Sequence, residues 1–184
     1  MTPQNAQKKR KHPLWWYIAT WFGSGTAKTA SGTAGSLAAL PFAYVIQVTL
    51  GNFALLFASV GMFFLGWWAT KQFLRYQPEK GMDPKEVVVD EVAGQWLVLS
   101  VLYPTWESYL VGFLLFRVFD VIKPWPVCWA DRNIKGELGV MFDDFLAAMY
   151  PIVVYLLIML EAQMDRSHHL LHPVINFLGG GYVH

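Results

Sequence analysis

The sequence is poor in charge and nearly free of cysteine. Charged residues make up 15% of the 184 positions, with 14 Lys and Arg against 13 Asp and Glu. A protein that binds nucleic acid needs a strongly basic face to displace counterions from phosphates, so this balance argues against a nucleic acid partner. The one cysteine, Cys128, excludes a disulfide framework and a multi-cysteine metal site. Nothing in the sequence indicates an obligatory protein partner.

Three catalytic signatures are also missing. The sequence contains no Gly-Lys pair, which excludes a Walker A nucleotide loop. It contains no G-x-S-x-G nucleophile elbow, which argues against a serine hydrolase of that type. The residue six positions after Cys128 is Ile134 rather than arginine, so the pattern of a cysteine phosphatase is absent. Any catalytic chemistry must therefore use other side chains.

Long apolar runs are what the chain has in abundance. Hydrophobic residues account for 55% of the sequence, and nine residues are tryptophan, a composition typical of integral membrane proteins. We predict an all-α, polytopic membrane helical bundle with about five transmembrane helices. These helices are expected at residues 35–50, 53–74, 87–103, 108–122 and 145–161.

The two ends of the chain differ from this apolar middle. Residues 1–12 form a basic polar tail, and residues 13–23 are aromatic enough for an N-terminal amphipathic helix at the membrane interface. The aromatic segment lacks an A-x-A-like cleavage site, so we expect no signal peptide. Residues 13–161 are predicted to form a single membrane-embedded domain, followed by a C-terminal tail at 162–184.

The basic residues alternate between the predicted loops. Lys and Arg occur in residues 8–11, 71–85 and 123–135, whereas the connections near residues 51 and 104 have neither. By the positive-inside rule, the N-terminus and both basic loops face the cytoplasm, and a chain with five spans ends outside.

The carboxylates gather on the same predicted side of the membrane. Five of them lie at three segment ends: Asp90 and Glu91, then Asp120, then Asp143 and Asp144. Ionised groups near hydrocarbon are costly unless they are paired, hydrated or bound to a cation. We therefore interpret the five acids as a functional site. The stretch DRNIKGELGVMFDD, which ends in the last pair, is expected to belong to the long basic loop after the fourth segment.

A structural explanation stays open for each acid. Asp and Glu in the first turn of a helix cap free N–H groups and complement the helix dipole, which would suffice for the four paired acids. Asp120 ends its segment, where a negative charge is disfavoured, so it needs partners. Arg117 and Lys123 stand three residues to either side and could supply them as plain ion pairs.

Carboxylates beside Lys and Arg at a membrane surface suit metal-assisted phosphoryl chemistry. Mg²⁺ prefers oxygen ligands and is usually held by one or two carboxylates, while Lys and Arg neutralise phosphate oxygens. The stretch GSGTAKTASGTAGSLAALP at residues 23–41 offers small residues and free N–H groups before a helix. It could cradle a phosphate or serve only as a flexible helix entry. These features predict chemistry on a phospholipid-related phosphate.

Four blocks run in order from about Trp21 to Pro151: GSG with SGTAGSLAALP, VVVDEVAGQW, FRVFDVIKPWP, and DRNIKGELGVMFDDFLAA. In this order and spacing the chain resembles the bacterial phosphatidylglycerophosphatase A family of Mg²⁺-dependent membrane phosphatases. The resemblance implies removal of the terminal phosphate of phosphatidylglycerol phosphate, which yields phosphatidylglycerol and inorganic phosphate. It also implies a multi-pass protein of the bacterial inner membrane with its active site facing the cytoplasm.

The resemblance further implies roles for individual residues. It identifies the catalytic acids as Asp90, Asp120 and Asp144, with Asp120 either a metal ligand or the base that orients the attacking water. It assigns Mg²⁺ to Asp90, Glu91, Asp143 and Asp144. The residues expected to bind substrate are Thr33, Ser36, Arg117, Lys123, Arg132 and Asn133. A covalent aspartyl-phosphate and direct attack by water both stay open.

Two other functions would also use acids in a membrane protein. A lipid phosphotransferase of the CDP-alcohol type binds divalent metal near the cytoplasmic face, but its D-x-x-D-G-x-x-A-R pattern is absent here. A small ion-coupled transporter would be expected to hold its carboxylates near mid-bilayer in broken helices. Metal-dependent phosphate release would distinguish a phosphatase from both.

Overall fold

The computed structural model describes residues 12–81 and 83–179, with side chains described up to Met164. Residues 1–11, nearly all of the predicted basic tail, lie outside the described residues. Every regular element within the described ranges is helical, which confirms the all-α prediction. The helices are α1 (Leu14–Ala19), α2 (Ser31–Leu50), α3 (Asn52–Tyr76), α4 (Val89–Leu99), α5 (Trp106–Ile122), α6 (Val127–Asn133), α7 (Gly136–Ala147) and α8 (Met149–Gly179), with short 3₁₀ turns at η2 (Ser24–Thr26) and η3 (Pro78–Lys80).

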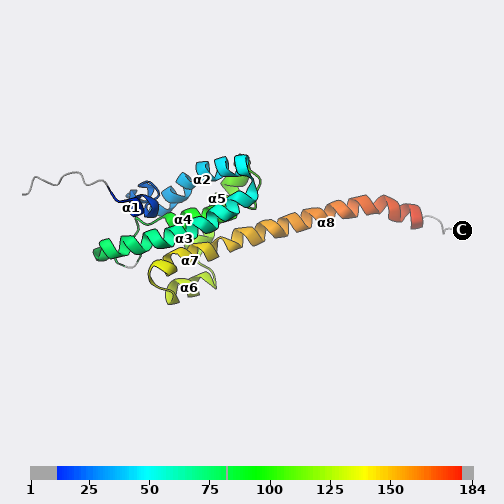
Figure 1. Cartoon of the computed structure of the whole chain (residues 1–184). Helices are drawn as coiled ribbons and strands as arrows, with labels where there is room; N and C mark the ends of the chain where they lie inside the picture. The colour runs from blue at the N-terminus through cyan, green and yellow to red at the C-terminus, as the bar shows by residue number, and fades with distance from the viewer. Residues whose placement is uncertain (1–11, 82, 180–184) are drawn as a thin grey trace, which may run out of the picture.

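Helix α4 is the centre of the bundle. It packs against α2, α3, α5 and α7, and all of its residues except Glu91 are buried (Figure 1). Its 11 residues rise about 16 Å, well short of a hydrocarbon layer of about 30 Å. The apolar run at 87–103 therefore forms a short helix enclosed by protein rather than a full span. A continuous apolar run has the same sequence pattern whether lipid or protein surrounds it, so periodicity alone cannot distinguish the two.

Three helical stretches in the described chain are long and apolar enough to cross a membrane. They are α2, α3 and the stretch Gly136–Met164, which joins α7 to the first half of α8. Helix α5 has 17 residues, at the lower limit for a span. The prediction of about five spans is thus supported for three of the predicted segments.

Helix α1 is a short aromatic element packed on the end of α3. The ring of Trp15 stacks on Tyr76 and meets Phe73 edge-on. With six residues α1 rises only about 9 Å, so it cannot cross a bilayer. Its placement at the membrane interface stays a prediction.

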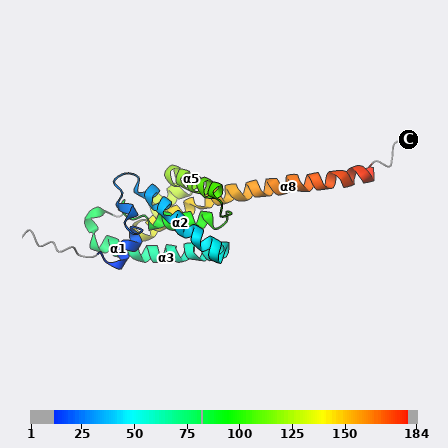
Figure 2. The same ribbon diagram turned by 90° about the horizontal axis from the view of Figure 1, so that it is seen from above.

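Helix α8 leaves the bundle on the side away from α1 and runs far beyond the other helices (Figures 1 and 2). It continues to Gly179 with no break at residue 161, where the sequence suggested the start of a tail. The side chains of residues 165–179 lie outside the described part.

A buried glutamine joins three helices at the C-terminal end of α4. The Nε2 group of Gln47 donates to the carbonyls of Leu99 at 3.1 Å and Leu102 at 2.7 Å. The hydroxyl of Tyr109 donates to Gln47 Oε1 at 2.6 Å. These bonds add to those that Leu102 N and Asn52 Nδ2 donate to the same two carbonyls, and they fix the depth of α4 between α2 and α5.

Candidate active site

A cavity of about 200 Å³ opens where α4 begins. Helix α4 contributes its first turn, α5 its last turn, and α7 its C-terminal half, so three chain segments deliver acids to one place. Six acids and two lysines line the cavity: Asp83, Asp90, Glu91, Asp120, Asp143 and Asp144 with Lys85 and Lys123. This excess of negative charge requires further cations before an anionic substrate can enter.

Three of the acids form a compact oxygen cluster. Asp90, Glu91 and Asp144 each offer a carboxylate oxygen, and these oxygens lie within 4.8 Å of one another. Asp90 and Asp144 are buried, and Glu91 Oε2 is buried without a hydrogen-bond partner among the described residues. Carboxylates held this close without a cation repel one another and lose their hydration. An all-oxygen donor set of this kind fits a hard divalent cation such as Mg²⁺.

Asp120 is paired with the arginine one turn earlier on α5. Arg117 Nη1 lies 2.6 Å from Asp120 Oδ2 and 3.9 Å from Glu91 Oε1. Both side chains of the α5 pair are largely buried. The ion pair therefore gives Asp120 the partner that its place at a helix C-terminal end requires. It also draws Arg117 toward the oxygen cluster.

Lys123 joins α5 to α6 and α7. Its backbone adopts a left-handed conformation (φ 48°) at the end of α5. Its Nζ group donates to Asp131 at 2.7 Å and also to Asp143.

Burial acts to lower the pKa of Lys123, but the bonds to Asp131 and Asp143 outweigh it and raise the pKa above its usual value. The hydrogen bond from Lys123 lowers the pKa of the Asp131 carboxyl. Lys123 is therefore charged, and Asp143 is held by a lysine rather than by the oxygen cluster.

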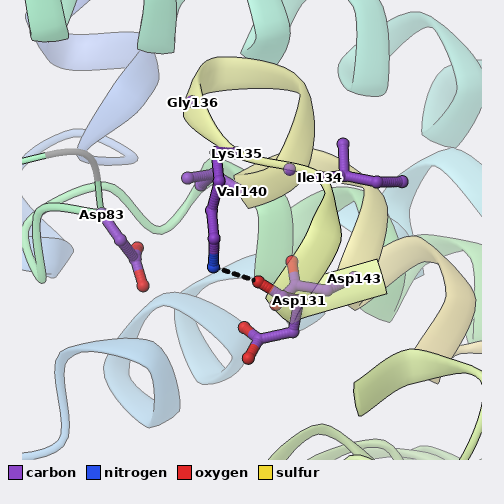
Figure 3. A pocket seen from close by; sticks show the side chains of 8 residues that line it. Asp83, Asp131, Ile134, Lys135, Gly136, Val140 and Asp143 are labelled. Atoms are coloured by element: carbon purple, nitrogen blue, oxygen red, sulfur yellow. Dashed lines mark hydrogen bonds between the residues drawn. The ribbon is translucent and has the colours of Figure 1, made fainter. Parts of the chain in front are cut away.

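A second, smaller hollow adjoins the cavity and shares Asp83, Val140 and Asp143 with it. Figure 3 shows Lys135 reaching back toward α6, where its Nζ donates to the backbone carbonyl of Asp131 at 2.7 Å. Asp83 approaches from the segment before α4 on the other side. The polar region thus extends past the acids toward the surface.

The stretch DRNIKGELGVMFDD forms helices rather than the expected loop. It comprises the end of α6, a turn, and α7, which begins at Gly136 with a φ of 75°. Asp143 and Asp144 consequently lie near the C-terminal end of α7, where a negative charge is disfavoured. Helix capping therefore cannot explain this pair, whereas Asp90 and Glu91 do stand in a first turn.

A glycine lets α2 approach the oxygen cluster. A Cβ added at Gly32, in the first turn of α2, would lie 2.1 Å from Glu91 Oε1 and 3.1 Å from Arg117 Nη2. No side chain fits there unless Glu91 moves. The small residues of the stretch at 23–41 therefore have a packing role beside the acids.

The predicted site residues divide into two groups. The cavity brings together all five predicted acids with Lys123, and Arg117 contacts two of those acids. Of the six residues expected to bind substrate, only Lys123 lines the cavity; Thr33, Ser36, Arg117, Arg132 and Asn133 do not. Ser36 is fully buried, and Asn133 Nδ2 donates to the carbonyl of Trp129.

Three polar lining residues were not predicted from the sequence: Ser31, Asp83 and Lys85. Ser31 begins α2 and lies close to the predicted Thr33 in sequence. Asp83 and Lys85 belong to the polar segment just before Asp90. Their nearness in sequence to VVVDEV could have indicated that they lie near the site. An irregular segment, however, has no periodicity from which to predict its course.

The fold and the cavity together define a class. It is the class of helical proteins with three potential membrane spans and an acid-rich cavity at the start of the central helix. This class includes membrane enzymes that act on phosphorylated lipids.

Comparison with known proteins identifies the family. A family model described as Phosphatidylglycerophosphatase A matches residues 17–159. The chain belongs to this family, as its four sequence blocks predicted, and it is a phosphatase, a phosphoric monoester hydrolase. No solved structure gives a significant match.

Three curated relatives show how far the similarity extends. Phosphatidylglycerophosphatase A of Escherichia coli is 37% identical over 140 residues, which cover 73% of this chain and 77% of the relative. The protein of the same name from Haemophilus influenzae is 34% identical over 158 residues, or 84% of this chain and 94% of the relative. A putative phosphatidylinositol-3-phosphatase of Bacteroides thetaiotaomicron is 38% identical over 144 residues, covering 74% and 88%.

Proposed function

We propose that this protein is a Mg²⁺-dependent phosphatidylglycerophosphatase that hydrolyses the terminal phosphate of phosphatidylglycerol phosphate at the cytoplasmic face of the bacterial inner membrane. One observation carries the proposal. In a chain of this family, three carboxylates place their oxygens within 4.8 Å of one another in a cavity that also holds Lys123.

The oxygen cluster is the proposed Mg²⁺ site. Asp90, Glu91 and Asp144 would hold the ion. Glu91 Oε2 has no hydrogen-bond partner among the described residues, and the three acids together supply only oxygen ligands. Bound there, Mg²⁺ would supply the positive charge that polarises a phosphoryl group. Asp143 would act differently from its predicted role as a ligand, because its Oδ2 accepts from Lys123.

The remaining charged residues would act on the phosphate and the water. Arg117 and Lys123 are oriented by acids and would contact phosphate oxygens. Asp120 Oδ2 is taken by Arg117, which leaves Oδ1 to accept a proton from the attacking water. Ser31, at the start of α2, would bind substrate through its hydroxyl in place of Thr33 and Ser36, because Ser31 lines the cavity.

The charge of the loops supports a cytoplasmic site. The segments nearest the cavity carry Lys71, Arg75, Lys80, Lys85, Lys123, Arg132 and Lys135. The connection at Gly51 and the one at 103–105, at the other end of α2 and α4, have no Lys or Arg. Under the positive-inside rule the cavity end faces the cytoplasm.

The direct test is inorganic phosphate release from phosphatidylglycerol phosphate in detergent micelles, first with Mg²⁺ and then with excess EDTA. We expect release with Mg²⁺ and none with EDTA, restored by adding Mg²⁺ back. Equal release under both conditions would refute the metal requirement. Phosphatidylinositol 3-phosphate, the substrate class in the name of the Bacteroides relative, belongs in the same assay. Faster release from that lipid would reassign the substrate while leaving the phosphatase chemistry intact.

A further inference from the structure

Lys85 stands at the exposed edge of the cavity on a backbone that is held in place. Pro84, on one side of it, is buried, and the carbonyl of Pro84 accepts a bond from Val87 N at 2.9 Å. Val88 N donates to the carbonyl of Ala19 at 2.9 Å, which ties this segment to the end of α1. The segment is therefore fixed at both ends of a tight turn. Lys85 itself is exposed and lines the cavity.

The cation that shares the cavity with Lys85, and the arginine that contacts two of its acids, are already paired with carboxylates. Lys123 bonds to Asp131 and Asp143, and Arg117 is paired with Asp120. Lys85 forms no ion pair with any described residue. Its positive charge is thus available to a ligand without breaking an internal bond, which distinguishes it from Lys123 and Arg117.

The acids nearest to Lys85 in sequence do not neutralise it. Glu86 is occupied by Lys80, with which it forms an ion pair and a hydrogen bond. Asp83 makes no described ion pair and faces the adjoining hollow beside Lys135 and Asp131 as well (Figure 3). A lysine kept apart from neighbouring carboxylates at the mouth of an acidic cavity is suited to an anionic group that remains near the surface.

Phosphatidylglycerol phosphate carries two different phosphates. The terminal phosphomonoester is the group that reacts, and the phosphodiester joins the headgroup to the diacylglycerol. If the monoester lies among the buried oxygen cluster, the diester one glycerol unit away lies toward the cavity mouth, where the acyl chains lead back to the membrane. We propose that Lys85 binds this phosphodiester and so selects a lipid with two phosphates. The inference rests on the proposed function and adds a specificity residue to it.

The test compares Lys85→Met with Arg75→Met. Arg75 is exposed in the last turn of α3 and lines no described cavity, so its variant removes the same charge from a nearby surface. For Lys85→Met we expect the KM for phosphatidylglycerol phosphate to rise about fivefold or more, with kcat within about twofold of wild type. Arg75→Met should keep both values. Lys85→Arg should restore the KM, because the guanidinium also pairs with a phosphodiester.

Orthovanadate distinguishes the two phosphates. It mimics the transferring phosphoryl group and has no diester, so its inhibition constant Ki should be the same for Lys85→Met as for wild type. Weaker inhibition of Lys85→Met would place Lys85 on the monoester and overturn the proposal, as would an unchanged KM or a loss confined to kcat. Phosphate release by the wild-type protein tests the proposed function separately, so failure of one is not mistaken for failure of the other.

Discussion

At the scale of single residues, the site separates two kinds of acid. Asp90, Glu91 and Asp144 share a cluster without a basic partner closer than 3.9 Å, the distance from Arg117 to Glu91. Asp120 and Asp143 each bind a basic side chain. The sequence predicted that these five acids would gather, because each stands at a segment end on one side. The sequence also offered Arg117 as a partner of Asp120, three residues away on one helix, and the structure has this ion pair. It could not predict that Lys123 pairs with Asp131 and Asp143 instead of Asp120, because that depends on how α5, α6 and α7 are oriented.

Replacing Asp144 by Asn should abolish phosphate release while leaving the fold intact. The amide matches the carboxylate in shape but removes one charge from the oxygen cluster, and we expect a loss of about 100-fold or more in kcat. Glu107→Gln is the control, because Glu107 is exposed at the start of α5, away from the cavity. Near-normal turnover by folded Asp144→Asn would show that the Asp144 carboxylate is not required for catalysis.

Replacing Gly32 by Ala should also reduce activity, although Gly32 has no reactive side chain. The new methyl would lie 2.1 Å from Glu91 Oε1 and displace that carboxylate. Misplacement by about 1 Å can cost about 100-fold in rate. Gly61→Ala is the matched control, because a Cβ at this helical position in α3 meets nothing within 4 Å. Phosphate release would be measured for both, and equal rates would show that Glu91 tolerates the shift.

At the scale of helices, the sequence located most elements and misjudged what surrounds them. The segments at 53–74 and 108–122 match α3 and α5 within two residues at each end. The segment at 145–161 does not match a single helix, because α7 ends at Ala147 and α8 begins at Met149. The enclosed position of α4 was not visible in the sequence, since it is set by contacts with five other helices, α2, α3, α5, α7 and α8.

Gln47 should matter for stability rather than chemistry. Gln47→Leu would remove one hydrogen bond from each of the Leu99 and Leu102 carbonyls, which keep the donors Leu102 N and Asn52 Nδ2, and would leave the buried Tyr109 hydroxyl without its described acceptor. Each unsatisfied buried group costs about 1–3 kcal/mol, so Tm in detergent should fall by several degrees. Gln72→Leu is the comparison, since the Gln72 side chain makes no described hydrogen bond. A Tm shift equal to that of Gln72→Leu would show that water replaces the lost bonds.

At the scale of the whole molecule, the acidic cavity is a source of instability that the proposed Mg²⁺ would relieve. Mutual repulsion of buried carboxylates opposes folding, and a ligand that binds only the folded state raises Tm with its concentration. We expect millimolar Mg²⁺ to raise Tm by a few degrees over EDTA. The shift should vanish in Asp144→Asn and persist in Glu107→Gln. A shift of the same size in Asp144→Asn would mean that Mg²⁺ acts elsewhere.

The stretch Gly136–Met164 both lines the cavity and presents an apolar surface long enough to cross a membrane. Its first half holds Asp143 and Asp144 at the cavity, and its second half exposes apolar side chains such as Leu156, Leu157 and Leu160. A helix seated in lipid adjusts its height to the hydrocarbon thickness at a cost of a fraction of a kcal/mol per ångström. Because only the single residue Ala148 separates α7 from α8 in the described chain, Asp143 and Asp144 would move up or down together with a second half seated in lipid. In the proposed membrane enzyme, bilayer thickness would then set how deep these two carboxylates lie below the lipid phosphates.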